Sequence, residues 1–229
     1  SEHASAAMLE FGKLVEEAGF PAGVVNIVTG HADPCGRALT SHPLVQRISF
    51  TGGTSAARHV VRNSAENFAQ VSLELGGKSP FIVFNDANIE SAVNGSIAGI
   101  FGASGQSCVA GSRLYLHNSI ADQFLDKMLL QTQAIKLGDP LEDATQMGPL
   151  ATYAQIEHVE RQIEIAKVEG GNILTGGDRV NTPDIGWYYP PTIVECPRQN
   201  LTIVCTELFG PVLSVLRFDD EDEVLQMAN

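Results

Sequence analysis

One cysteine in the sequence has surroundings suited to nucleophilic chemistry. Cys108 lies in the stretch SGQSCVAG, among small and polar residues, where an apolar helix is expected to end. The glycines on either side, Gly105 and Gly111, would let a substrate approach the backbone, and a thiolate there could attack it. On this spacing alone, Cys108 also fits a buried cysteine that packs as a small hydrophobic side chain.

Glu74 is a second candidate, because it ends an apolar run in the stretch LELGGKSP. Open α/β sheets bind ligands at the carboxyl ends of their strands, and a carboxylate there can act as a general base. The alternative is an exposed strand-end carboxylate with no chemical role. The letters GGKS do not form a phosphate-binding loop, because Ser72 stands where that motif needs glycine and a β-rich run follows.

Two further motifs could bind a cofactor. In FTGGT, a predicted strand leads through Gly52 and Gly53 to a helix N-terminus, which favours anionic phosphates. In TELFGPV, Glu207 and Phe209 precede a Gly-Pro turn, so a carboxylate and an aromatic ring could hold a sugar and a base. Taken singly, the first motif also fits an ordinary βα turn, and the second fits a core Phe209 beside a surface Glu207.

The elements that must position these residues alternate between helices and strands. Apolar residues at helical spacing predict helices over residues 1–18, 34–40, 54–65, 88–104, 119–135, 153–171 and 220–229. Ser119 is the predicted cap of the fifth helix. Apolar runs predict strands over residues 24–30, 45–52, 70–77, 79–84, 112–117, 190–195 and 210–218, with a long loop at 175–191. This alternation predicts an α/β fold with parallel sheets covered by helices.

The bulk composition narrows the class of protein. The formal net charge of −13 and the scattered Lys and Arg argue against nucleic acid as a partner. The four cysteines form no CxxC or CxxH pair, so neither a metal site nor a disulfide framework is expected. Without a membrane span or a signal-peptide pattern, we expect a cytoplasmic protein with no membrane partner.

Together the motifs resemble those of the aldehyde dehydrogenase superfamily. PAGVVNIVTG, FTGGT, LELGGKSP, GQSC and ELFGPV occur in that family's order and at about its spacing, through essentially the whole chain. The resemblance implies a Rossmann-like fold in which residues 1–74 are the C-terminal part of an NAD(P)-binding domain. Residues 75–229 would form a catalytic domain that is incomplete at its C-terminus. The chain is therefore expected to be a central fragment, truncated at both ends.

The resemblance also implies a role for each motif residue. Cys108 matches the catalytic nucleophile, which forms a thiohemiacetal and then a thioester while its own N–H holds the oxyanion. Glu74 matches the general base that activates the deacylating water. The positions that match cofactor-binding residues cover both riboses, the pyrophosphate turn and the segment beside the nicotinamide: Glu2, Gly52, Gly53, Leu75, Gly76, Glu207 and Phe209.

Some features of the family pattern are missing. The oxyanion-hole asparagine would lie upstream of residue 1, and so would the lysine expected two positions before Glu2. Many members carry serine at the position of Gly53, so a side-chain phosphate contact is not expected here.

The implied function is oxidation of an aldehyde to a carboxylic acid with NAD(P)⁺, by a protein that forms a homodimer or homotetramer. NAD is favoured over NADP, because the Glu2 carboxylate would repel a 2′-phosphate. Two alternatives stay open. An acylating enzyme would pass the thioester to coenzyme A, although such members usually lack a glutamate at the position of Glu74. This truncated chain could also be weakly active or non-catalytic, because it lacks half of the oxyanion hole.

Overall fold

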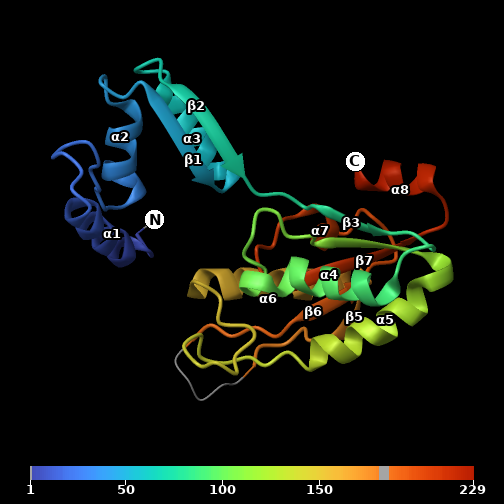
Figure 1. Ribbon diagram of the computed structural model, residues 1–229. Coiled ribbons are helices and arrows are strands. Elements are labelled where there is room, and N and C mark those ends of the chain that lie inside the picture. Colours follow the sequence, from blue (N-terminus) through green and yellow to red (C-terminus); the bar gives the residue numbers. More distant parts are fainter. Residues whose placement is uncertain (1, 181–185) are drawn as a thin grey trace. The chain divides into compact units, whose positions relative to one another are not determined.

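The computed structural model describes residues 2–180 and 186–229. The chain forms two compact units, Ser1–Leu75 and Gly76–Asn229 (Figure 1). The division lies one residue after the boundary predicted at residue 74. The function of each unit stays a prediction.

The first unit contains a two-stranded parallel sheet. β1 (Arg47–Gly52) pairs with β2 (Gln70–Leu75), and α3 (Thr54–Ser64) connects them. Ile48, Val60 and Ala69 form a small core between this helix and the strands. The earlier part of the unit is helical, with α1 at Ser5–Glu17, a π-helical turn at Ala32–Gly36 and α2 at Arg37–Ser41.

The strand predicted over residues 24–30 is wrong. This segment has no regular secondary structure, and Val24 and Val28 are exposed. A strand must bond its backbone groups to a neighbouring strand. In the described part of this unit, β1 and β2 pair only with each other, so the apolar run has no strand beside it. The apolar composition of this segment therefore predicted a strand that does not form.

The second unit is built on a five-stranded sheet in the order β3-β4-β7-β6-β5. Four neighbouring strands run parallel, as predicted, and β5 joins β6 in the antiparallel direction. The strands are β3 (Pro80–Val83), β4 (Arg113–His117), β5 (Asn172–Thr175), β6 (Thr192–Glu195) and β7 (Val212–Phe218). The helices are α4 (Ile89–Phe101), α5 (Asn118–Gln133), α6 (Tyr153–Val168), α7 (Thr202–Cys205) and α8 (Glu221–Ala228), with a 3₁₀ turn at Gly102–Gly105.

Both faces of this sheet are buried. Leu114 and Leu116 of β4 pack into a core with side chains of α4 and α5. Tyr115, between them, packs into a second core with side chains of α6. Because alternate residues reach opposite faces and both faces are covered, the central strands are continuous apolar runs in the sequence.

Several local predictions need correction. α5 begins one residue earlier than predicted, so its cap is His117, whose Nδ1 accepts the N–H of Ser119 at 3.2 Å. The sequence did not predict β5, α7 or the long stretch over residues 134–152 that contains neither helix nor strand. Of the predicted loop at 175–191, residues 181–185 lie outside the described part of the chain.

Arg113 links the segment before β3 to the end of α8. Its Nε donates to the carbonyl oxygen of Lys78 at 2.6 Å, and its Nη2 donates to that of Ala228 at 2.8 Å. Lys78 is itself partly buried, and this burial lowers the pKa of its amine to about 8. The nearby charge of Arg113 contributes to this lowering, so protonated Lys78 destabilises the folded unit.

Leu114 tests the assignment of the core. It is fully buried on β4, and replacement by alanine should lower the free energy of unfolding by about 2–5 kcal/mol through lost contacts and a new cavity. Leu130 on α5 is 71% exposed, so the same substitution there should change that energy by less than about 0.5 kcal/mol. Urea denaturation measures both, and equal losses would contradict the core assignment.

Lys78 gives a pH-dependent prediction. Its folded-state pKa lies below the ordinary value of 10.5, so its cost to stability is complete below about pH 8 and disappears as the pH rises toward 10.5. The free energy of unfolding of the natural chain should therefore rise from pH 8 to pH 10 relative to a Lys78→Met variant. Urea denaturation at both values measures this, and a constant difference between the two proteins would refute it.

Candidate active site

The cysteine lies in a tightly turned loop. Cys108 follows the 3₁₀ turn and precedes β4, and its side chain is exposed. Before it, Ala103, Ser104 and Gly105 have φ angles of 50°, 55° and 72°. Left-handed backbone is costly for the two non-glycine residues. The exposed thiol excludes the alternative of a buried packing cysteine.

The backbone beside the thiol has a free donor. Ala110 donates its N–H to the carbonyl of Ser107 at 3.2 Å, and Val109 donates to the Ser107 hydroxyl at 3.4 Å. Among the described residues, nothing accepts a hydrogen bond from the N–H of Cys108. A free N–H next to a nucleophile can stabilise an oxyanion that forms on the attacked carbon.

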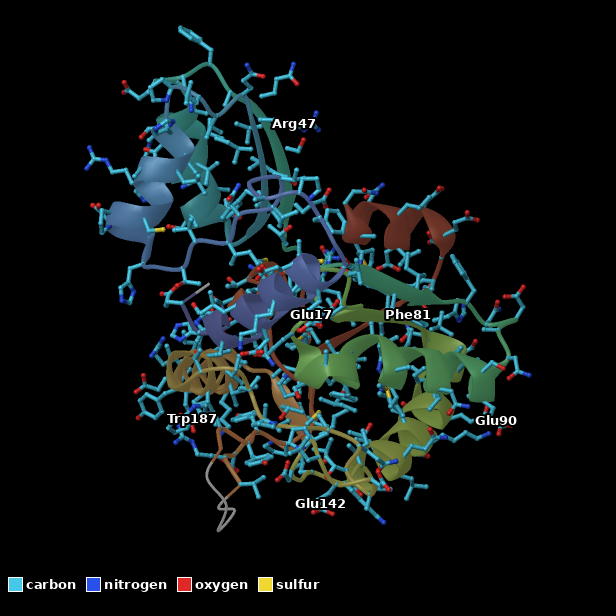
Figure 2. The ribbon with its side chains drawn as sticks, turned by 60° about the vertical axis from the view of Figure 1, so that its left-hand side comes forward. Glu17, Arg47, Phe81, Glu90, Glu142 and Trp187 are labelled. Carbon is cyan, nitrogen blue, oxygen red and sulfur yellow. The ribbon has the colours of Figure 1, made fainter. Side chains whose placement is uncertain are left out.

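The glycines around the cysteine serve packing. A Cβ at Gly105 would collide with the carbonyl oxygen of Gly210, so the loop can approach residues 207–211 only with glycine there. A Cβ at Gly111 would lie 3.3 Å from the Cβ of Phe81, which Figure 2 labels on β3. Both glycines therefore allow close contacts inside the unit, and the interpretation that they also give a substrate room stays a prediction.

A second loop places a carboxylate and an aromatic ring before β7. Glu207 is half-buried, and its Oε1 accepts the N–H of Gly77 at 3.2 Å. A Cβ at Gly76 would collide with the same carboxylate. Phe209 is exposed and has a φ of 52°, so it is not a core residue. The second unit therefore brings Gly76, Glu207 and Phe209 together.

A small hollow lies between the two loops. Its lining includes Gly77, Lys78, Ser107, Glu207 and Phe209. A larger cavity of about 280 Å³ lies elsewhere in the unit and is lined by Cys196, Arg198 and Arg217. The smaller hollow is the better candidate for the site, because the loop that carries Cys108 meets Glu207 and Phe209 there.

In the first unit, the candidates gather where the two strands end. Gly52 pairs with Leu75, the last residue of each strand, and Glu74 pairs with Thr51. Gly53 caps α3 without a side-chain bond, so the helix N-terminus presents backbone N–H groups that suit a phosphate. Glu74 is exposed.

Glu2 lies in an exposed turn before α1. The pKa of its carboxyl is lowered, chiefly by a hydrogen bond from its own backbone. Since Glu2 and Glu74 belong to the first unit and Cys108 and Glu207 to the second, the catalytic pairing of Glu74 with Cys108 stays a prediction.

The four cysteines are free thiols in different surroundings. Cys196 is buried after β6, and burial raises the pKa of its thiol to about 11. Cys205 donates to the carbonyl of Gln199 at 3.4 Å, and Cys35 is half-buried. Only Cys108 combines exposure with a free neighbouring N–H and a loop packed against a carboxylate and a ring, so it fits the nucleophile best.

In each unit, taken by itself, the residues present suit one part of a dinucleotide. In the first unit the glycine-capped helix suits a pyrophosphate, and in the second unit the Oε2 of Glu207, which accepts no hydrogen bond from the described residues, suits a ribose hydroxyl. In the described part of the chain, no three His, Cys, Asp or Glu side chains are grouped to hold a metal. The same part of the chain has no helix with the length and apolar character that a membrane span needs.

The sequence did not reveal the side chains that hold the two loops. Ser104, Gln106 and Gln155 all bond across the second unit. Gln106 stands inside the GQSC motif, so its position offered a signal. Gln155 lies on a half-polar helix surface, where nothing in the sequence distinguishes it from its neighbours.

Comparison with known proteins places the whole chain in one family. A family model described as "Aldehyde dehydrogenase family" matches residues 1–229. The chain is 53% identical to (Z)-2-((N-methylformamido)methylene)-5-hydroxybutyrolactone dehydrogenase of Acinetobacter baylyi, covering 100% of this chain and 47% of that protein. It is 43% identical to hydroxyisobutyraldehyde dehydrogenase of Mycolicibacterium austroafricanum, covering 100% and 45%.

The fold agrees with solved structures. The NAD⁺ complex of an aldehyde dehydrogenase from Bacillus cereus superposes with a TM-score of 0.95 at 40% identity, covering 100% of this chain and 46% of that one. The chain thus spans about half the length of the relatives it matches. The family model, the identities and the superposition agree: the chain belongs to the aldehyde dehydrogenase family.

Proposed function

We propose that the protein containing this chain oxidises an aldehyde to a carboxylic acid with NAD(P)⁺, using Cys108 as the nucleophile. The observation that carries the proposal is the exposed thiol of Cys108 beside its own N–H, which has no acceptor among the described residues. Membership of the family supports the reaction class, and the first unit would contribute to cofactor binding while the second carries the nucleophile. We also propose that this acidic protein is located in the cytoplasm and forms a homodimer or homotetramer.

The proposed mechanism has two covalent stages on Cys108. The thiolate attacks the aldehyde carbon, a C–S bond forms, and the N–H of Cys108 donates to the resulting oxyanion of the thiohemiacetal. When bound, NAD(P)⁺ supplies the acceptor for the hydride that leaves this carbon. Cys108 then carries a thioester. Glu74 takes a proton from water, the water oxygen attacks the thioester carbon, and the C–S bond breaks to give the acid and the thiolate.

The proposed cofactor residues divide by position in the fold. Glu207 would accept hydrogen bonds from the nicotinamide-side ribose, and Phe209 would contact it. The end of the two-stranded sheet and the start of α3 would hold the pyrophosphate. The remaining contacts are assigned to Leu75 and Gly76 near the nicotinamide and Glu2 at the adenosine ribose. The NAD⁺ complex of the Bacillus cereus relative supports NAD as the cofactor, with NADP as the second possibility.

Glu74→Gln tests the role of the general base. In the full-length protein, the first turnover should still release a burst of NADH, because attack and hydride transfer do not need the carboxylate. Steady-state turnover should fall by about 10²–10⁴-fold, the usual contribution of a general base. Glu66→Gln, at another exposed carboxylate of the first unit, is the matched control.

Stopped-flow measurement of NADH separates the burst from the steady state. Unchanged turnover in Glu74→Gln would remove Glu74 from the mechanism. Formation of an acyl-coenzyme A by the natural protein would favour the acylating alternative over the hydrolytic one.

The 229-residue chain should be a poor enzyme by itself. The asparagine that would complete the oxyanion hole is outside it, and loss of one such donor costs about 10²–10³ in rate. We expect calorimetric titration with NAD⁺ to show binding by the full-length protein and little or none by this chain. Micromolar binding by the chain would contradict the expectation and show that the two units suffice for the cofactor.

A further inference from the structure

The two loops that carry the proposed chemistry are held by one segment. The cysteine loop (residues 102–108) and the Glu207 loop (residues 207–210) both form hydrogen bonds with residues 148–155, here named the brace segment. The brace segment runs from the end of the irregular stretch into the first turn of α6.

The cysteine loop is bonded to the brace segment at two points. The hydroxyl of Ser104 donates to the carbonyl of Gly148 at 2.8 Å, and the Oε1 of Gln106 accepts the N–H of Ala151 at 3.0 Å. Ser104 is buried and has a left-handed backbone conformation. Its hydrogen bond therefore holds the loop at a residue whose conformation is energetically unfavourable.

The Glu207 loop is bonded through a single side chain. Both amide protons of Gln155 are used, because its Nε2 donates to the carbonyl of Leu208 at 2.5 Å and to that of Phe209 at 2.9 Å. Two donors on consecutive carbonyls fix the orientation of the peptide between them. Phe209 is left-handed, a conformation that a bulky residue adopts only when its surroundings impose it.

The brace segment is itself anchored. Thr152 caps α6 by accepting the N–H of Gln155 at 3.2 Å. Leu150 is buried and donates its N–H to the carbonyl of Trp187 at 2.9 Å. The ring of Trp187, which Figure 2 labels, packs edge to face against the ring of Tyr153, with 4.9 Å between the ring centroids. These contacts fix the backbone that carries Gln155.

We propose that Gln155 is a positioning residue that holds Glu207 and Phe209 in the geometry needed to bind the nicotinamide half of the cofactor. The proposal rests on the proposed function, since it concerns the same site. Gln155 acts through the backbone of the Glu207 loop and takes no part in the chemistry at Cys108. Its loss should weaken the cofactor site while the thiol keeps its reactivity.

Gln155→Met tests this role, because methionine has nearly the same shape and no donor. In the full-length protein, the KM and Kd for NAD⁺ should rise about tenfold through the loss of two hydrogen bonds. The rate at which iodoacetamide alkylates Cys108 should stay unchanged, as should the melting temperature within a few degrees. Gln131→Met, at an exposed glutamine of α5, is the matched control.

A second variant separates donor loss from other effects. Gln155→Glu keeps the shape and removes both donors, so it should weaken NAD⁺ binding at least as much, and it stands in for Gln155→Met if that variant does not fold. An effect in the glutamate variant alone would assign the loss to charge and overturn the proposal. Parallel losses in cofactor affinity, alkylation rate and melting temperature would also overturn it, because they indicate a general structural role.

Hydrogen exchange tests the same role without a cofactor. The amide protons of residues 207–210 should exchange faster in Gln155→Met than in the natural protein, while those of β4 should not change. If the natural protein fails to bind NAD⁺, the proposed function fails, and exchange still decides whether Gln155 holds the loop. Unchanged exchange at residues 207–210 would overturn the inference itself.

Discussion

The contact of Gly105 with the carbonyl of Gly210 is the constraint on which the site in the second unit depends. Neither residue can carry a side chain there: a Cβ at Gly105 would collide with that carbonyl, and one at Gly210 would lie 2.7 Å from Val159 of α6. The two loops therefore meet backbone against backbone. Ser107 and Phe209 both line the small hollow beside this contact.

Sheet topology explains why these loops are neighbours at all. The cysteine loop leads into β4, the Glu207 loop leads into β7, and these strands pair in parallel. The segment Gly76–Lys78 leads into β3, which pairs with β4 on its other side. Because parallel neighbours begin at one edge of a sheet, three segments far apart in the sequence reach the same edge. The buried sheet then fixes their spacing.

The sequence predicted what local patterns determine and missed what distant partners determine. Helical spacing in residues 153–171 and glycine at position 170 were enough to predict α6. The apolar residues 24–30 looked like a strand, yet a strand exists only where another pairs with it. The packing of Gly111 against Phe81 was not predicted, because Phe81 lies 30 residues away in the sequence. The role of Gln155 was not predicted for the same reason, since the carbonyl groups that accept its hydrogen bonds belong to a loop distant in the sequence.

The left-handed residues before Cys108 also affect how the protein can be engineered. Each non-glycine residue in such a conformation raises the free energy of the folded state by about 1–3 kcal/mol. Ala103 is therefore a position where glycine could stabilise the protein, whereas glycine at Ser104 would also lose the hydroxyl bond to the carbonyl of Gly148. Selection for thermal stability alone would favour such a change and would give the backbone of this turn more freedom, so the stability gained could come at a cost to the proposed activity. A stabilised variant of this family member should therefore be designed away from the cysteine loop.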